Sequence, residues 1–132
     1  LANEGEFSTS PNYENYLNDL MDYHSSETHA HHLKRYKIIK GDASKTIKEY
    51  LKDNQQTVIA LAYFDVDLYK PTKDCLMAIK PYLTKGSVIG FDEPNLKYFP
   101  GETIAMREAF GSTKYKLYTS KFSAGSGYLV IE

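Results

Sequence analysis

Tryptophan is absent from the 132 residues, and cysteine occurs once, as Cys75. A single cysteine excludes a disulfide within the chain, and its position on an apolar helical stripe favours a small core residue over a nucleophile. No apolar run approaches the roughly 18 residues of a membrane-spanning helix, and the polar, acidic first residues show no signal-peptide pattern. We therefore expect a cytoplasmic protein without a membrane partner.

An excess of either charge is also lacking, because 16 Lys and Arg residues stand against 17 Asp and Glu residues. Nucleic-acid binding depends largely on basic residues that neutralise phosphates, and the sequence shows no basic face. We therefore expect no nucleic-acid partner. The 42% hydrophobic and 25% charged residues fit one domain with a sizeable core.

Two apolar segments typical of β-strands each end in acidic residues. Residues 58–64 form a continuous run rich in β-formers, which predicts a strand buried on both faces by flanking helices. A second apolar strand is expected at 87–91. The acidic residues that follow the two strands are Asp65 with Asp67, and Asp92 with Glu93.

An amphipathic helix is expected between the two strands. Its apolar residues recur at three- and four-residue spacing, so that one stripe can pack on the sheet: Cys75, Leu76, Ile79 and Leu83. Pro71 suits the first turn, where the N–H group that proline lacks would have no partner, and Gly86 is expected to end the helix. The crossover makes the strands parallel, so both acidic pairs lie at the sheet edge where α/β proteins bind ligands.

Carboxylates gathered at one edge repel each other, and a hard divalent cation such as Mg²⁺ would neutralise them. Mg²⁺ prefers oxygen ligands and commonly takes some of them from water and substrate. The alternative is that Asp67 caps the following turn while Asp92 and Glu93 are solvated loop acids. The positions of the strand ends leave both interpretations open.

Residues 64–95, FDVDLYKPTKDCLMAIKPYLTKGSVIGFDEPN, resemble the metal-binding region of the macrocin O-methyltransferase family. The shared motifs are a D-x-D-x-Y segment at 65–69, a P-x-L-x-x-G turn at 81–86 and an acidic pair at 92–93. The segment FPGETIAMREAFG, at 99–111, is similar to the family's next helix. The resemblance covers roughly residues 36–132 and is most specific between 63 and 111.

The resemblance implies an enzyme that transfers a methyl group from S-adenosylmethionine to a hydroxyl of a sugar, sugar nucleotide or related small molecule. Mg²⁺ would orient and activate that hydroxyl. The implied metal ligands are Asp65, Asp92 and Glu93, and Glu93 departs from the family's common Asp-Asp pair. Asp42 and Ala43 would contact the adenine of the cofactor, and Asp65 is a further expected cofactor contact.

Methyl transfer to a hydroxyl needs a base that removes the proton. Asp67 is the candidate base, and Asp65 is the alternative that would act from the metal shell. Tyr69 and Tyr98, near the same edge, are expected to border the substrate.

Asp42 has a second interpretation. Aspartate is a favoured N-cap, and Asp42 directly precedes an expected helix that begins at Ala43 or Ser44. Capping the helix and contacting an adenine ring are compatible roles.

Four histidines crowd one segment: His24, His29, His31 and His32. His29 and His32 are three residues apart, a spacing at which two imidazoles on one helix face can bind a metal. The alternative is an exposed polar face or a lining of the substrate cleft, from which one histidine could serve as the base.

The fold class implied by the resemblance is α/β, a Rossmann-like class I methyltransferase sheet that is mostly parallel with an antiparallel C-terminal hairpin. The order of its strands in the sheet is 3-2-1-4-5-7-6. A short strand is expected at 36–39, and the hairpin is expected at 115–118 and 128–131. No G-x-G pattern occurs between residues 1 and 40, so we expect the C-terminal portion of the fold, without strands 1 and 2.

We accordingly expect one incomplete methyltransferase domain over 1–132, with a helical segment at 1–35 and an α/β core portion at 36–132. The first helix should begin near Pro11, with tyrosine rings packed inward and hydroxyls in water: Tyr13, Tyr16 and Tyr23. The chain by itself is expected to be inactive. Its uncovered strand edges need a cover, for which a second copy in a homo-oligomer is one candidate.

Two other functions are alternatives to methyl transfer. A non-catalytic interaction or assembly fragment, docking through the tyrosine-rich first helix, is favoured by the lack of a glycine-rich turn. A CoA-transferase has no support, because no candidate nucleophilic aspartate stands in a glycine-rich loop.

Overall fold

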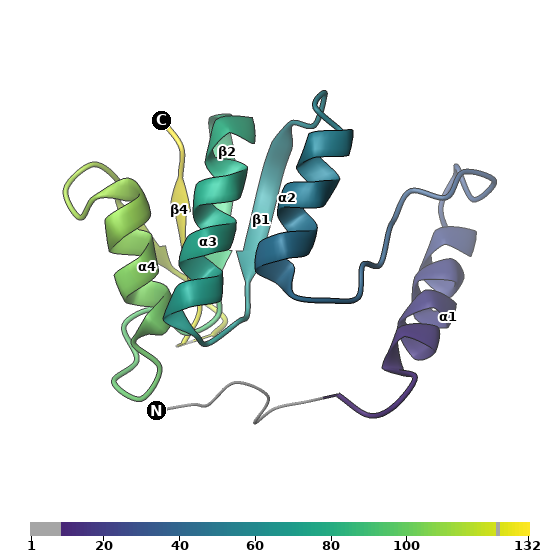
Figure 1. The fold of residues 1–132 in the computed structure, drawn as a ribbon, viewed down its shortest axis with the longest axis horizontal. Helices are drawn as coiled ribbons and strands as arrows, with labels where there is room; N and C mark the ends of the chain where they lie inside the picture. The colour runs from purple at the N-terminus through teal and green to yellow at the C-terminus, as the bar shows by residue number, and fades with distance from the viewer. Residues whose placement is uncertain (1–8, 124) are drawn as a thin grey trace.

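The computed structural model describes residues 9–123 and 125–132, which form four α-helices and one four-stranded sheet (Figure 1). The elements in chain order are α1 Tyr13–Ser26, α2 Ala43–Asp53, β1 Ile59–Phe64, α3 Tyr69–Ile79, a 3-10 turn Lys80–Tyr82, β2 Leu83–Phe91, α4 Gly101–Phe110, β3 Leu117–Thr119 and β4 Gly127–Val130. None of the described helices is long and apolar enough to cross a membrane.

The sheet has the strand order β1-β2-β4-β3. β1 and β2 are parallel, whereas β4 runs antiparallel to both β2 and β3. This is the 4-5-7-6 portion of the expected strand order, and it ends in the expected antiparallel hairpin. The predicted fold class is therefore confirmed for this part of the sheet.

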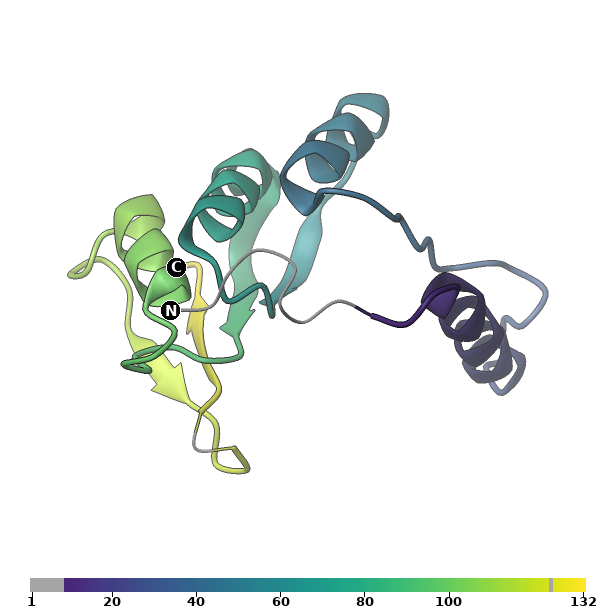
Figure 2. The ribbon, with the colours of Figure 1, turned by 60° about the horizontal axis from the view of Figure 1, so that its bottom comes forward.

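Three helices, α2, α3 and α4, lie side by side on one face of the sheet (Figures 1 and 2). α3 occupies the middle of this layer and packs against both of its neighbours. The residues that α3 buries are Thr72, Cys75, Leu76 and Ile79, so Cys75 is the core residue that the helical stripe predicted. They meet the sheet at Phe64 and Phe91, whose rings stack with centroids 5.6 Å apart.

The prediction that β1 is buried on both faces is wrong. Leu61 is 65% exposed and Tyr63 is 57% exposed, although Phe64 on the same strand is buried. Successive side chains of a strand point to opposite faces, and in the described residues the helices α2, α3 and α4 cover only one of them (Figure 2). An apolar run therefore identified the strand but could not show that one face is open.

Gly86 lies inside β2 and does not end the helix. α3 ends at Ile79, and the strand begins at Leu83 after the 3-10 turn. The pairing of β1 and β2 is irregular between Ile59 and Leu61. On β2, Gly86 adopts a positive φ of 88°, which a residue with a side chain rarely adopts. Ser87 bridges the irregularity by donating from Oγ to the Ile59 carbonyl at 2.7 Å.

The expected helix near Pro11 is present as α1, but it buries none of its residues. Tyr16 is 57% exposed and Tyr23 is 61% exposed, so the prediction of inward-packed rings is wrong for them. α1 stands apart from the layer of α2 to α4 (Figures 1 and 2), so none of these described helices covers its rings.

The strand expected at 36–39 does not form, and the segment at 28–35 contains turns in place of a helix. A strand needs a partner for its backbone groups, and in the described chain the sheet begins at β1. Residues 36–40 are tied to α1 instead, since Tyr36 donates to Asp22 Oδ1 at 2.7 Å and Lys40 pairs with Glu14 at 2.7 Å.

Candidate active site

The two acidic strand ends lie next to each other at the carboxyl edge of the sheet, as predicted. Phe64 and Phe91, the last residues of β1 and β2, are paired in register. The backbone N–H of Asp92 donates to the Phe64 carbonyl at 3.0 Å, so the pairing continues past the end of β2. Asp65 and Asp92 therefore occupy adjacent positions directly after the two strands.

The carboxylates of this edge influence one another electrostatically. Burial raises the pKa of Glu93, and the negative charges of Asp67, Asp92 and Asp65 raise it further. The pKa of Asp67 is likewise raised, first by burial and then by the charges of Asp65 and Asp92. The edge thus holds four acidic groups whose charged forms oppose each other.

The Glu93 carboxylate has an unusual environment. Its Oε2 atom is buried and has no hydrogen-bond partner. A buried polar atom without a partner is uncommon, and such an oxygen could serve as a ligand to a cation. An all-oxygen donor set of this kind has the chemistry that Mg²⁺ prefers.

The acidic side chains of this edge have suitable donor atoms, but in the described chain they are not gathered into a metal site. Within residues 9–123 and 125–132, no three His, Cys, Asp or Glu side chains are gathered closely enough to hold a metal ion. The residues at the edge therefore fit a divalent cation by donor type and by the unpartnered Glu93 oxygen. The ligand assignment of Asp65, Asp92 and Glu93 stays a prediction.

Asp92 is held by side chains from β1 and from the turn before β4. The Tyr63 hydroxyl donates to Asp92 Oδ1 at 2.6 Å, and the Ser126 hydroxyl donates to the same atom at 3.4 Å. The Tyr63 ring reaches Asp92 by crossing Gly90, where an added Cβ would lie 2.7 Å from the ring. Glycine at position 90 therefore leaves the space through which Tyr63 orients Asp92.

Asp67 is brought together with both tyrosines that were expected to border the substrate. Asp67, Tyr69 and Tyr98 line one small pocket of about 240 Å³, together with the start of α4 at Gly101. Asp67 has a φ of 59°, a left-handed conformation that aspartate tolerates better than most residues. The candidate base thus faces the space in which a small polar substrate group could lie.

The Tyr69 hydroxyl is already engaged. It donates to Glu108 Oε2 at 2.6 Å and accepts from Lys73 Nζ at 2.9 Å. Lys73 and Glu108 also form an ion pair at 2.6 Å, which joins α3 to α4. Tyr69 therefore offers the pocket mainly its ring, while Tyr98 is 77% exposed and free of such ties in the described structure.

Asp42 is the N-cap of α2, as one of its two interpretations predicted. Its Oδ1 accepts from the Ser44 N–H at 3.0 Å and from the Ser44 hydroxyl at 2.7 Å, and the hydroxyl contact is the main cause that lowers the pKa of Asp42. Asp42 also lines a hollow of about 670 Å³ between the starts of α2 and α3, together with Tyr69 and Pro71. The adenine contact of Asp42 and Ala43 stays a prediction.

The histidines lie apart from the acidic edge. His29, His31 and His32 fall in the turns that follow α1, at the side of the molecule away from the ends of β1 and β2 (Figures 1 and 2). The helix face that would pair His29 with His32 does not form, and the described chain has no metal-binding group there. Asp67 remains the better placed candidate base.

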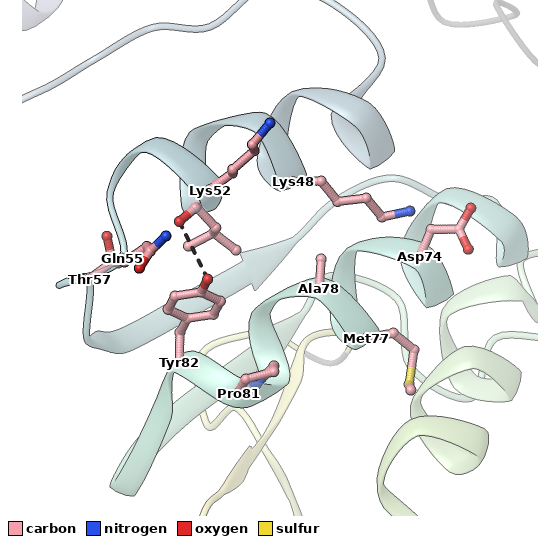
Figure 3. Close-up of a pocket in the computed structure, with 10 residues that line it drawn as sticks. Lys48, Lys52, Gln55, Thr57, Asp74, Met77, Ala78, Pro81 and Tyr82 are labelled. Carbon is pink, nitrogen blue, oxygen red and sulfur yellow. Dashed lines mark hydrogen bonds between the residues drawn. The ribbon is translucent and has the colours of Figure 1, made fainter.

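A larger hollow of about 820 Å³ lies between α2 and α3 (Figure 3). It is lined by Lys48 and Lys52 of α2 and by Met77 of α3, and Tyr82 closes one end by donating to the Leu51 carbonyl at 3.3 Å. None of the acidic strand-end residues lines it. It is a surface groove of the helix layer and is separate from the candidate site.

The residue that sequence reasoning missed is Glu102, in the first turn of α4. It is 1% exposed, and its carboxylate accepts hydrogen bonds from the backbone N–H groups of Val66 and Glu93. Burial raises the pKa of Glu102, while those N–H donors, with that of Asp67, act in the opposite direction. An acid in a first helical turn usually faces solvent, so only the fold reveals this contact.

Solved structures of a known methyltransferase are similar to the chain. No protein-family model and no curated protein matches the chain. The crystal structure of the calicheamicin methyltransferase CalS11 is 43% identical over 96% of the chain and 50% of its own length, with a TM-score of 0.90. An apo structure of CalS11, described as a TDP-rhamnose 3'-O-methyltransferase of calicheamicin biosynthesis, is 43% identical over 94% of the chain and 54% of its own, with a TM-score of 0.88. The chain thus spans about half the length of these structures.

Proposed function

The chain belongs to the macrocin O-methyltransferase-like family of sugar and small-molecule O-methyltransferases, and we propose that it forms the C-terminal part of a metal-dependent enzyme that methylates a sugar hydroxyl. The observation that carries the proposal is the acidic edge, where Asp65, Asp67, Asp92 and Glu93 follow two adjacent strand ends in a chain that is 43% identical to a sugar O-methyltransferase.

Each part of the edge receives a role in this proposal. Asp65, Asp92 and Glu93 would hold Mg²⁺, and Glu93 Oε2, which has no hydrogen-bond partner, is an oxygen that could serve as a ligand. Bound there, Mg²⁺ would hold substrate oxygens and lower the pKa of the hydroxyl to be methylated. Tyr63 and Ser126 keep Asp92 oriented through their hydrogen bonds.

Asp67 is the proposed base that takes the hydroxyl proton. Its raised pKa makes it a stronger base than an ordinary aspartate, and it lines the same pocket as Tyr69 and Tyr98. Asp65 is the second candidate, from the adjacent strand end. The tyrosine rings would border the sugar, so that positioning and the fixed charges of the edge supply most of the acceleration.

S-adenosylmethionine is the proposed methyl donor, with its adenine in the hollow that Asp42 lines. Asp42 and Ala43 stand at the start of α2, where the Asp42 carboxylate, which also pairs with Lys45 at 3.4 Å, and nearby backbone groups can meet an adenine edge. Asp65 would approach the cofactor from the strand end. The substrate class we propose is a nucleotide-linked sugar, by similarity to the TDP-rhamnose of CalS11.

The test uses the intact enzyme that contains this chain, with S-adenosylmethionine labelled in its methyl group. TDP-rhamnose, a second TDP-deoxysugar and a simple catechol are offered in parallel. Labelled methyl on a TDP-sugar hydroxyl, dependent on Mg²⁺, supports the proposal. Methylation of the catechol alone would replace the substrate class, and transfer to none of the three would contradict the proposal.

One observation favours a second candidate, an assembly role for the first helix. α1 buries none of its residues, and Tyr16 and Tyr23 expose more than half of their surface. Sedimentation of the chain with and without Tyr16→Ser and Tyr23→Ser tests this. A loss of self-association in the double variant supports the role, and an unchanged monomer in both argues against it.

A further inference from the structure

Glu102 joins the two acidic strand ends through one buried carboxylate. Its Oε1 accepts from the N–H of Val66 at 3.2 Å, and Val66 stands between Asp65 and Asp67. Its Oε2 accepts from the N–H of Glu93 at 3.4 Å. A single side chain, 1% exposed, therefore fixes the backbone of both segments that carry the acidic residues.

The start of α4 gives Glu102 little freedom to move. An added Cβ on Gly101 would lie 2.5 Å from the Asp67 carbonyl oxygen and 2.5 Å from the Tyr69 nitrogen, so the helix touches the backbone after β1 directly. Thr103 Oγ1 accepts from the Asn95 N–H at 2.6 Å and holds the segment after β2. Gly101 and Glu102 of α4 thus lie against the acidic segments, and Thr103 holds Asn95 just beyond them.

We propose that Glu102 is a positioning residue, which sets the separation of the Asp65–Asp67 segment from the Asp92–Glu93 segment and so prepares both for one divalent cation. The inference deepens the proposed metal site and rests on it. A carboxylate is needed because two N–H groups donate to two different oxygens. Glutamine offers one acceptor oxygen in the same shape, and alanine offers none.

The experiment measures two properties of the chain, with Mn²⁺ alone as the metal probe. Hydrogen exchange of the Val66 and Glu93 amides reports the contacts themselves, and a Mn²⁺ titration followed by electron paramagnetic resonance reports the site. The variants are Glu102→Gln and Glu102→Ala. Glu108→Gln, on the exposed side of the same helix, is the matched control.

Exchange of one of the two amides should become at least tenfold faster in Glu102→Gln, and that of both amides in Glu102→Ala. Mn²⁺ affinity should fall by about 10- to 100-fold, the usual cost of losing a residue that orients metal ligands. Glu108→Gln should change neither property. If Glu102→Ala does not fold, the exchange and affinity of Glu102→Gln decide.

The outcomes separate this inference from the proposed metal site. If the substitutions make exchange faster but even the unsubstituted chain binds no Mn²⁺, then Glu102 positions the two segments and the proposed metal site is wrong. Unchanged exchange at Val66 and Glu93 in Glu102→Gln overturns the inference. Unchanged Mn²⁺ affinity in a chain that does bind Mn²⁺ also overturns it.

Discussion

At the scale of single residues, the acidic edge is organised at some cost to stability. Glu93 and Asp67 both have a raised pKa because they are partly buried next to other negative charges. A site that binds a cation commonly accepts such repulsion, since the ion offsets it when bound. The same edge should therefore respond to the loss of one charge differently from acids elsewhere in the chain.

We predict that Asp65→Ala leaves the metal-free chain as stable as before or slightly more stable. The substitution removes one of the charges that oppose ionised Asp67 and Glu93, and exposed substitutions otherwise change stability by only about 0.5 kcal/mol. Thermal unfolding measures the effect. Asp42→Ala is the control, since removing an N-cap should lower the melting temperature. A similar decrease for Asp65→Ala would contradict the repulsion.

At the scale of secondary-structure elements, the position of α4 depends on the absence of a side chain at residue 101. An added Cβ there would meet backbone atoms of Asp67 and Tyr69, which cannot rotate away. Gly101→Ala should therefore destabilise the chain, because overpacking costs about 1–3 kcal/mol. Most of that range exceeds the roughly 1 kcal/mol by which alanine favours a helix over glycine.

Denaturant unfolding checks the prediction for Gly101. Gly125→Ala is a suitable control, since its added Cβ would lie in ordinary contact at 3.5 Å from the Asp92 carbonyl oxygen. An unfolding free energy for Gly101→Ala equal to that of Gly125→Ala would show that α4 shifts without cost.

The ion pair between α3 and α4 should make stability depend on pH. Lys73 donates to Glu108 and holds the pKa of Glu108 below its ordinary value of 4.5. A lowered pKa in the folded state means that the stabilisation is present above the ordinary pKa and is lost as pH falls through the folded value. The melting temperature of the unsubstituted chain should exceed that of Glu108→Gln slightly at pH 7. The difference should disappear in strong acid, and a difference that grows on acidification would contradict this account.

Sequence patterns predicted the elements better than their surroundings. The two parallel strands, the helix between them and the C-terminal hairpin all followed from apolar periodicity and turn residues. The open face at Leu61 and Tyr63 did not, since an apolar run does not report which helices are available to cover it. The prediction of a strand at 36–39 was wrong for a related reason, because a strand forms only where a neighbouring strand can pair with it.

The sequence likewise predicted the acidic strand ends of the candidate site but not the buried glutamate that contacts them. Acidic residues at two strand ends were placed at one edge because parallel strands share their carboxyl end. Glu102 could not be found in this way, because its partners Val66 and Glu93 are separated from it by 36 and 9 residues. Contacts of that kind depend on how α4 packs, which local sequence does not specify.

At the scale of the whole molecule, the chain matches about half of each similar structure. In the described residues, one sheet face and most of α1 are uncovered. Residues 1–40 also contain no G-x-G pattern of the kind that holds the methionine end of S-adenosylmethionine. Binding surfaces of the complete enzyme that lie outside this chain cannot contribute to ligand affinity when the chain is studied by itself.

We therefore predict no micromolar binding of S-adenosylmethionine by the isolated chain. Adenine contacts at Asp42 and Ala43 would remain, but each hydrogen bond lost to the charged methionine end removes roughly 1.5–3 kcal/mol. Several such losses weaken binding by orders of magnitude. Calorimetry measures this directly. A micromolar dissociation constant would mean that this part of the sheet holds a cofactor site of its own.

The measurement that tests the central claim most directly is the methyl-transfer rate of the intact, metal-stripped enzyme as Mg²⁺ is added back. The unsubstituted enzyme should be inactive in excess chelator and recover fully with Mg²⁺. Asp65→Ala and Asp92→Ala should stay inactive while unfolding at a temperature close to the unsubstituted one, and Asp53→Ala, an exposed acid at the end of α2, should recover normally. Full activity in excess chelator, or normal activity of Asp65→Ala, would contradict a metal site at the acidic edge.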